Sequence, residues 1–193
     1  GAGGGILERE GGWRWRGVGV GWGGVAGVGG PVAATWSIVV VDLRTGEVAV
    51  ATATCLTNFD LRESVPVIVP GFGAGAHQSS VDTTGQNRLL NWTMMQEGVP
   101  VDEILQTIKD GDSLKRWRQI GMVSMRGDAI TFSGKGCGDW AGGVTGQVGP
   151  LVYAIQGNAL TGQPVVDAAE RALRNSTAPL AERILLALGP AAS

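Results

Sequence analysis

Glycine is spread unevenly along this chain, and its distribution limits what each part can fold into. Of the 33 glycines in 193 residues, 14 lie within the first 34 positions. Glycine loses more backbone entropy on ordering than any other residue, so a segment this rich in it is a poor helix or strand. We therefore expect residues 1–34 to be a disordered leader, residues 35–188 to form one domain, and residues 189–193 to be a truncated tail.

Composition excludes several classes of protein. Hydrophobic residues make up 44% of the chain and charged residues 17%, which is enough to build a core and unlike a disordered polymer. A net charge of -2 gives no reason to expect nucleic acid as a partner. No run of about 18 apolar residues is present, so we expect no membrane span.

Histidine and cysteine are scarce. The chain has one histidine, His77, and two cysteines, Cys55 and Cys137. A zinc site needs three or four such ligands at short spacings, so we expect no metal, and nothing indicates an organic cofactor. The two cysteines are 82 positions apart, and the sequence leaves a disulfide and two free thiols equally open.

The leader has the order of features found in an export signal. Arg14 and Arg16 precede a weakly apolar stretch over 17–32, and Val32-Ala33-Ala34 is a small-residue cleavage pattern. This interpretation predicts a secreted or periplasmic protein. The alternative, a disordered leader or a translated upstream region, predicts a cytoplasmic one.

Residue patterns predict strands and helices in separate groups. A tight turn at Gly46 should join runs 35–42 and 47–55 into an antiparallel pair, with Asp42 capping the turn rather than orienting Thr35. Further strands are expected within 64–76 and at 118–125, 129–133 and 151–158, helices at 85–96, 101–109, 164–174 and 180–188, and a loop at 134–149. Groups of each kind, rather than strict alternation, favour an α+β layered sandwich.

Thr35 stands at the boundary between leader and domain. If the leader is cleaved after Ala34, Thr35 becomes N-terminal, and its hydroxyl and α-amine together form a nucleophile and its base. Such a site needs no histidine. By spacing alone, the simpler interpretation is favoured, namely that Thr35 only opens a strand, as β-branched residues often do.

A family resemblance adds to this interpretation. The segments ATWSIVVVD, TGEVAVATATC, GAGAHQSSVDTTGQNR, RQIGMVS, GDWAGGVTG and YAIQGNAL occur in order between Ala34 and Leu160. Over residues 35–188 the chain resembles the family called domain of unknown function 1028, within the Ntn-hydrolase-like superfamily. The resemblance implies a four-layer αββα sandwich in which Thr35 occupies the place of the nucleophile. Similar proteins lack so glycine-rich a leader and continue beyond residue 193.

Residues at the end of the 151–158 strand are candidates to assist Thr35. The Asn158 amide or the Gly157 N–H could donate a hydrogen bond to a developing oxyanion, or the two residues could simply form a turn. We predict Gly157 and Asn158 as catalytic residues beside Thr35, and Gln156 as a substrate-binding residue.

Three more substrate-binding candidates follow the glycine-rich segment GFGAGA. His77 and Gln78 come directly after it, where a glycine backbone lets a ligand approach closely. Arg88 could hold a substrate carboxylate with two hydrogen bonds, although pairing with a neighbour such as Asp82 is the more usual role of such an arginine.

Two functions of different classes are compatible with the sequence. The first is an exported Ntn-type amidohydrolase that uses Thr35 on a small-molecule or peptide-like substrate. The second is a non-catalytic secreted binding module of the same fold, associated with the cell wall. The sequence leaves a homo-oligomer open.

Overall fold

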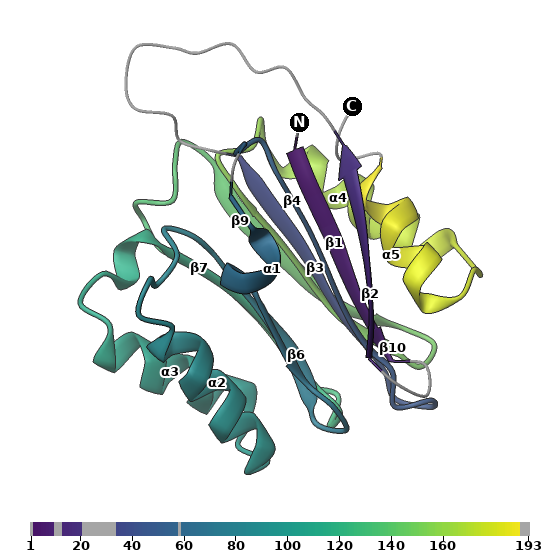
Figure 1. Ribbon diagram of the computed structural model, residues 1–193, viewed down its shortest axis with the longest axis horizontal. Coiled ribbons are helices and arrows are strands. Elements are labelled where there is room, and N and C mark those ends of the chain that lie inside the picture. Colours follow the sequence, from purple (N-terminus) through teal and green to yellow (C-terminus); the bar gives the residue numbers. More distant parts are fainter. Residues whose placement is uncertain (1, 10–12, 21–33, 58, 190–193) are drawn as a thin grey trace.

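The computed structural model describes residues 2–9, 13–20, 34–57 and 59–189, which form two antiparallel sheets and five α-helices (Figure 1). The larger sheet has the order β2-β1-β4-β3-β10-β9 and the smaller one β5-β6-β7-β8. The strands of the larger sheet are β1 (Ala2–Arg9), β2 (Trp13–Val20), β3 (Thr35–Asp42), β4 (Val48–Thr54), β9 (Ala141–Val148) and β10 (Leu151–Asn158). The strands of the smaller sheet are β5 (Pro66–Val69), β6 (Gly73–Ser79), β7 (Arg118–Ser124) and β8 (Ala129–Ser133).

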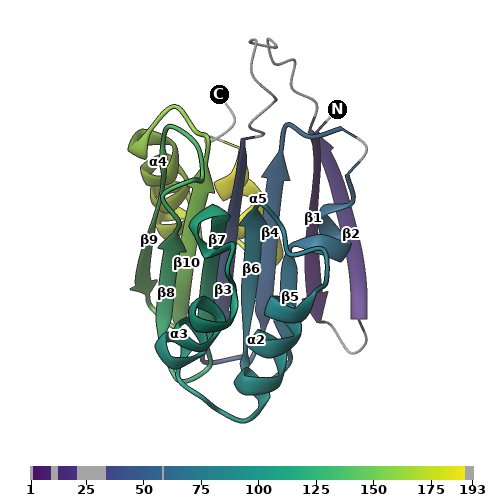
Figure 2. The same ribbon diagram turned by 90° about the vertical axis from the view of Figure 1, so that its left-hand side faces the viewer.

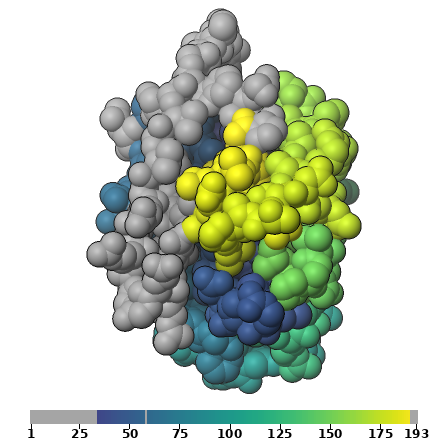
Figure 3. All heavy atoms as spheres, turned by 90° about the vertical axis from the view of Figure 1, so that its right-hand side faces the viewer, coloured from purple at the N-terminus to yellow at the C-terminus, as the bar shows by residue number. Residues whose placement is uncertain are grey.

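Helices cover the outer face of each sheet. The helices are α1 (Leu61–Ser64), α2 (Gln86–Gln96), α3 (Val101–Gly111), α4 (Gln163–Asn175) and α5 (Leu180–Leu188), with one 3-10 turn at Lys115–Trp117. Helices α2 and α3 pack on the smaller sheet (Figures 1 and 2). Helices α4 and α5 lie side by side on the larger sheet (Figure 3). The layers therefore run helix, sheet, sheet, helix, and the inner faces of the two sheets meet.

The alternation of side chains along each strand builds three cores. On β3, Ile38 and Val40 face α4 and α5, whereas Val39 and Val41 face the other sheet. A third core lies between the smaller sheet and the amphipathic helix α3. Strand β3 is buried along its whole length because both of its faces are covered, as its apolar run predicts.

Most of the predicted elements are present. Strand β3 occupies 35–42 and pairs antiparallel with β4, and the predicted strands 129–133 and 151–158 and helix 180–188 have the predicted bounds. The predicted loop at 134–149 is wrong, because Ala141–Val148 forms strand β9. Its glycines let the backbone lie tightly on β10: a Cβ at Gly143 would come 2.6 Å from the Ile155 carbonyl oxygen, and one at Gly146 would come 2.3 Å from the Tyr153 hydroxyl.

The prediction that the whole leader is disordered is also wrong. Ala2–Arg9 and Trp13–Val20 form an antiparallel hairpin, and β1 continues the larger sheet by pairing Gly5 with Thr52 and Ile6 with Ala51. Without the hairpin, β4 would be an edge strand, and the backbone groups of an edge strand can pair with another strand whatever side chains that strand carries.

The cleavage pattern at Val32-Ala33 and most of the tail lie outside the described residues. No described helix is long and apolar enough to cross a membrane.

Candidate functional site

The space between the two sheets changes character along its length. At one end it is filled by valines and alanines, and at the other by hydroxyl and carboxamide side chains. We call this second group the inter-sheet polar cluster. Its members, all buried, are Thr35, Ser37, Thr52, Thr54, Gln78, Gln119, Gln156 and Asn158.

Thr35 lies where β3 begins, between the neighbouring strands β4 and β10. It pairs with Thr54 on one side and with Asn158 on the other. Its Oγ1 is 2.9 Å from Thr54 Oγ1, and the residue is only 5% exposed. Thr35 and Asn158 are therefore adjacent, as predicted from the sequence.

Gln78 links the smaller sheet to this point. Its Nε2 is 3.0 Å from the Thr35 carbonyl oxygen, 2.8 Å from Gln119 Oε1 and 3.4 Å from Asn158 Oδ1, and its Oε1 accepts a hydrogen bond from Ser37. Gln78 thus lies beside Thr35, and its amide is fully engaged with other protein groups, so its role in substrate binding stays a prediction. The geometry makes it a connection between sheets.

Gln119 on β7 is a member that sequence reasoning missed. Its Nε2 donates to the Gly157 carbonyl at 2.7 Å and to Ser133 Oγ at 2.8 Å. The available signal was a glutamine within an otherwise apolar strand, at a position whose neighbours on the same face, Gly121 and Val123, point between the sheets.

Gln156 is fully buried, and neither its Nε2 nor its Oε1 has a hydrogen-bond partner among the described residues. Its amide lies against Gly121, where a Cβ would come 2.0 Å from Oε1. Gly157 has a packing reason to be glycine, since a Cβ there would come 2.3 Å from the Leu160 side chain. The roles of Gln156 in binding and of Gly157 in oxyanion stabilisation stay predictions.

Backbone strain borders the cluster. Among the described residues, two residues other than glycine have positive φ: Ser79 at 71° and Ala159 at 53°. Each directly follows a cluster member, Gln78 or Asn158. A left-handed conformation at such residues costs on the order of 1–3 kcal/mol, and strain of this kind gathers at functional sites.

His77 and Arg88 do not join the cluster, and their roles in substrate binding stay predictions. His77 points to the other face of the smaller sheet, where its Nε2 is 2.9 Å from Asn91 Nδ2 of α2. Burial lowers the pKa of His77 to about 3 and keeps the ring neutral near pH 7. Arg88 donates to the backbone carbonyl of Glu63 and so ties α2 to α1. Any ligand that His77 or Arg88 binds would occupy a different site.

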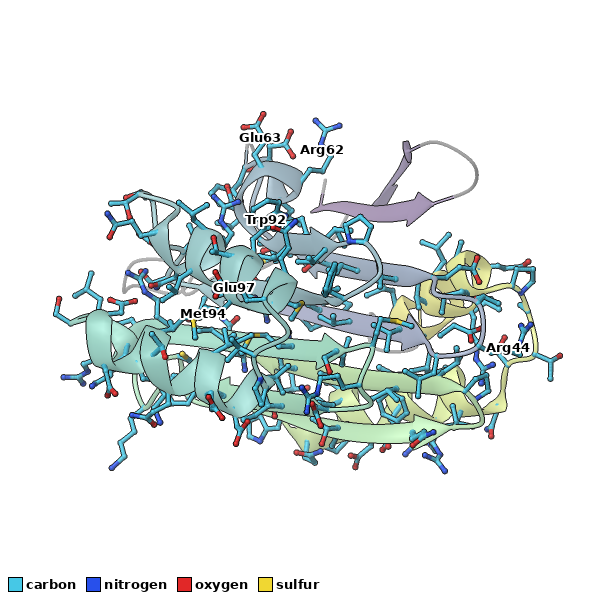
Figure 4. All side chains as sticks on the ribbon, turned by 90° about the horizontal axis from the view of Figure 1, so that it is seen from below. Arg44, Arg62, Glu63, Trp92, Met94 and Glu97 are labelled. Carbon is cyan, nitrogen blue, oxygen red and sulfur yellow. The ribbon has the colours of Figure 1, made fainter. Side chains whose placement is uncertain are left out.

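Asp42 and Gly46 form the turn at the far end of β3, as predicted. Asp42 Oδ1 accepts hydrogen bonds from the backbone N–H groups of Arg44 at 2.8 Å and Thr45 at 3.1 Å, and Gly46 has a φ of 76°. Figure 4 shows Arg44 at this turn, well separated from Met94 of α2 and from Glu97, which follows that helix. Asp42 is thus a turn cap, remote from Thr35.

Both cysteines are free, which removes the disulfide alternative in this structure. Cys55 is exposed, and the buried Cys137 Sγ lies 3.2 Å from the Arg118 carbonyl oxygen.

The described residues contain no group of three or more histidine, cysteine or acidic side chains that could hold a metal ion. The cluster members themselves carry only hydroxyl and carboxamide groups, which do not titrate near neutral pH.

The fold and the site together define an α+β protein with two facing antiparallel sheets, covered by helices, and a buried polar cluster at one end. The model of a family of unknown function, DUF1028, matches residues 35–193, and the chain belongs to this family. The crystal structure of protein SPO2555 from Silicibacter pomeroyi, which carries the same family description, is similar to the chain with a TM-score of 0.71 and 24% sequence identity. The similarity covers 82% of this chain and 67% of that one, and it concerns the fold alone. No curated protein matches the chain.

Proposed function

We propose that this chain is an N-terminal-nucleophile amidohydrolase in which Thr35 acts after residues 1–34 have been removed. The observation that carries the proposal is the position of Thr35, within the inter-sheet polar cluster, as the first residue of a central strand. The layer order helix, sheet, sheet, helix is the αββα arrangement expected for the Ntn-hydrolase class. The substrate would be a small molecule or peptide with an amide bond, and the protein would be exported.

The chemistry of the cluster explains why the leader would have to be removed. A threonine hydroxyl needs a base to become a good nucleophile, and the cluster members offer no carboxylate or imidazole. The α-amine of an N-terminal threonine, with a pKa of about 7.7–8.0, would be that base. While Ala34 is attached, the Thr35 nitrogen is an amide and cannot accept the proton.

The reaction would proceed in two stages. The α-amine takes the Oγ1 proton as Oγ1 attacks the amide carbon, then passes this proton to the leaving nitrogen, which leaves an ester on Thr35. Water, deprotonated by the same amine, then hydrolyses the ester. The Oδ1 end of the Asn158 amide faces Gln78, from which it accepts a hydrogen bond. The other end, Nδ2, carries the N–H donors that an oxyanion requires.

Substitutions of Thr35 test the nucleophile. In a chain with Thr35 at its N-terminus, Thr35→Ala should abolish labelling by an acylating probe and hydrolysis across a panel of amides. Thr35→Ser should keep part of the activity because the oxygen remains. Intact-mass and peptide analysis would locate the adduct. Activity that persists in Thr35→Ala with labelling at Cys55 or Cys137 would refute the assignment.

Asn158 tests the oxyanion assignment. Asn158→Ala should lower turnover on the order of 10²- to 10³-fold, the usual effect of losing one such donor. Its thermal unfolding midpoint serves as the control for folding. A variant that is folded and retains full turnover would remove Asn158 from the mechanism.

The second candidate function is a non-catalytic secreted binding module, associated with the cell wall. It is favoured by one observation: the Ala34 carbonyl oxygen accepts hydrogen bonds from Thr54 Oγ1 and from the Cys55 N–H, so the residue before Thr35 is itself held by the folded domain. Mass spectrometry of protein isolated from its native source separates the two functions. A chain that retains residues 1–34 has no α-amine on Thr35, which would exclude catalysis and favour binding.

A further inference from the structure

The hydrogen bonds of Thr54 fix the direction of the proton on Thr35. Thr54 Oγ1 lies 3.0 Å from the Ala34 carbonyl oxygen, which can only accept, so Thr54 donates its single hydroxyl proton there. In the contact of 2.9 Å between the two threonine hydroxyls, Thr35 must therefore be the donor. A chain of hydrogen bonds thus runs from Thr35 O–H through Thr54 O–H to the Ala34 carbonyl.

The Ala34 carbonyl oxygen accepts a second hydrogen bond. The Cys55 N–H donates to it at 3.1 Å, which continues the β3–β4 ladder by one step beyond Thr35 and Thr54. One donor from the last residue of β4 and one from the residue after it thus converge on the acyl oxygen of the residue before Thr35. Donors about 2.7–3.1 Å from an oxygen are the arrangement that stabilises an oxyanion.

Removal of residues 1–34 would take the acceptor away and leave both donors. With the leader in place Thr54 is only 2% exposed; after its removal the Thr54 hydroxyl can turn to Thr35 Oγ1, 2.9 Å away, whereas the Cys55 N–H loses the acceptor that it has in the full chain. The β4 side of Thr35 would then favour any ligand that brings an oxygen acceptor. The substrate of the proposed reaction brings one in its acyl carbonyl.

We propose that the Thr54 hydroxyl and the Cys55 N–H bind the acyl oxygen of the substrate and stabilise its negative charge in the tetrahedral intermediate. This inference rests on the proposed function and is the alternative to Asn158 as the oxyanion donor, because Asn158 lies on the other side of Thr35. Oγ1 of Thr35 forms a bond to the acyl carbon, the carbonyl π electrons move to the oxygen, and the hydroxyl proton goes to the α-amine. Thr54 and Cys55 keep their protons throughout and act only as hydrogen-bond donors.

Phenylboronic acid is the probe, because a boronate bound to a nucleophilic oxygen is tetrahedral and carries an oxygen in the oxyanion position. The full chain, with residues 31–34 replaced by a factor Xa site, is cut before Thr35 and used with its leader still in the sample. Boron-11 NMR should show a tetrahedral adduct that Thr35→Ala lacks. In nitrogen-15 spectra, the Cys55 amide should shift as the adduct forms.

Variants of Thr54 decide the outcome. Thr54→Val keeps the shape of the side chain but removes the donor, and it should weaken boronate binding on the order of 10²-fold. Thr54→Ser keeps the hydroxyl and should stay within about threefold of the wild type. Thr52→Val is the matched comparison: it removes a hydroxyl from the same face of β4 that donates to the Trp36 carbonyl at 3.2 Å, and its effect should be about threefold or less.

The possible failures are distinct. If the cut wild type forms no adduct on Thr35, both the proposed function and this inference are wrong. If the adduct forms but Thr54→Val binds boronate as tightly as the wild type, or the Cys55 amide does not shift, only the inference about Thr54 and Cys55 is overturned.

Discussion

The two halves of the space between the sheets are built from the same strands yet filled by opposite chemistry. On β3, Val39 and Val41 face the apolar half, and Thr35 and Ser37 face the polar half. On β4, Val48 and Val50 give way in the same manner to Thr52 and Thr54. Strand pairing is continuous through both halves, and the side chains are equally buried.

The difference shows which half holds the sheets together. Each buried valine stabilises the fold by about 1.5–3 kcal/mol through loss of apolar surface to water. Buried hydroxyls and amides only exchange hydrogen bonds with water for hydrogen bonds with each other, at a net gain of about 1 kcal/mol or less. The polar half therefore adds little stability, and it also borders the strained Ser79 and Ala159. The polar half is costly to build and adds little stability. A role in function therefore explains its composition better than packing does.

Acid should not act on this molecule through the polar half, because the cluster members do not titrate. The pKa of His77 is about 3 in the folded chain, against 6.5 for an unperturbed histidine. Between these two pH values His77 is protonated in the unfolded chain and neutral in the folded chain. The contribution of His77 to the free energy of unfolding is therefore full above about pH 6.5 and decreases as the pH falls towards 3. Urea unfolding at pH 5 should give a free energy about 2 kcal/mol lower than at pH 7.5.

His77→Gln should remove most of this dependence, because glutamine does not titrate. The comparison is best confined to pH 5–7.5, above the range in which Asp82 and Asp112, with their lowered pKa values, gain protons. A slope that survives His77→Gln would mean that an ionisable group elsewhere, including one near the polar cluster, changes its pKa on folding.

Two isosteric exchanges compare the halves directly. Val39→Thr places a hydroxyl among apolar side chains that offer it no acceptor, and should lower the free energy of unfolding by about 1–2 kcal/mol. Thr52→Val makes the reverse change in the polar half, where it removes the hydrogen bonds of Thr52 with the Trp36 carbonyl and with Ser37 but gains apolar burial, and should change stability by less than about 1 kcal/mol. Chemical denaturation of both variants provides the measurement. If Thr52→Val proved the more destabilising, the polar half would have a structural role after all.

The sequence predicted the fold better than it predicted the site. Apolar periodicity located β3, β10 and the helices because burial on one or two faces leaves a direct pattern in the residue order. Glycine content gave two wrong predictions, a loop in place of β9 and a disordered leader in place of the hairpin. The entropic cost of glycine can be estimated from the sequence, but the strand that pairs with the glycine-rich segment cannot. At β9 the glycines are what permits close contact with Tyr153 and Ile155.

The site was predicted in part for a related reason. Thr35 and Asn158 lie on neighbouring strands of one sheet, so register alone brings them together. Gln119 was missed because its contact with Gly157 crosses from one sheet to the other, and no local pattern encodes that step. His77 and Gln78 were grouped because they are adjacent in sequence, yet adjacent residues in a strand point to opposite faces. Only Gln78 reaches the cluster.

The smallest expected effect concerns the strain at the edge of the polar half. Ala159 follows Asn158 with a φ of 53°, a conformation that glycine adopts without the penalty from Cβ. Ala159→Gly should therefore raise the free energy of unfolding by up to about 1 kcal/mol, the relief of strain exceeding the added entropy of the unfolded chain. Ala178→Gly is the matched control, since Ala178 lies in the connection between α4 and α5 and has no positive φ, and it should lower stability by about 0.5–1 kcal/mol. Thermal unfolding of the two variants beside the wild type measures both signs. Equal destabilisation by both would show that Ala159 is not strained, and the link between strain and the polar half would fail.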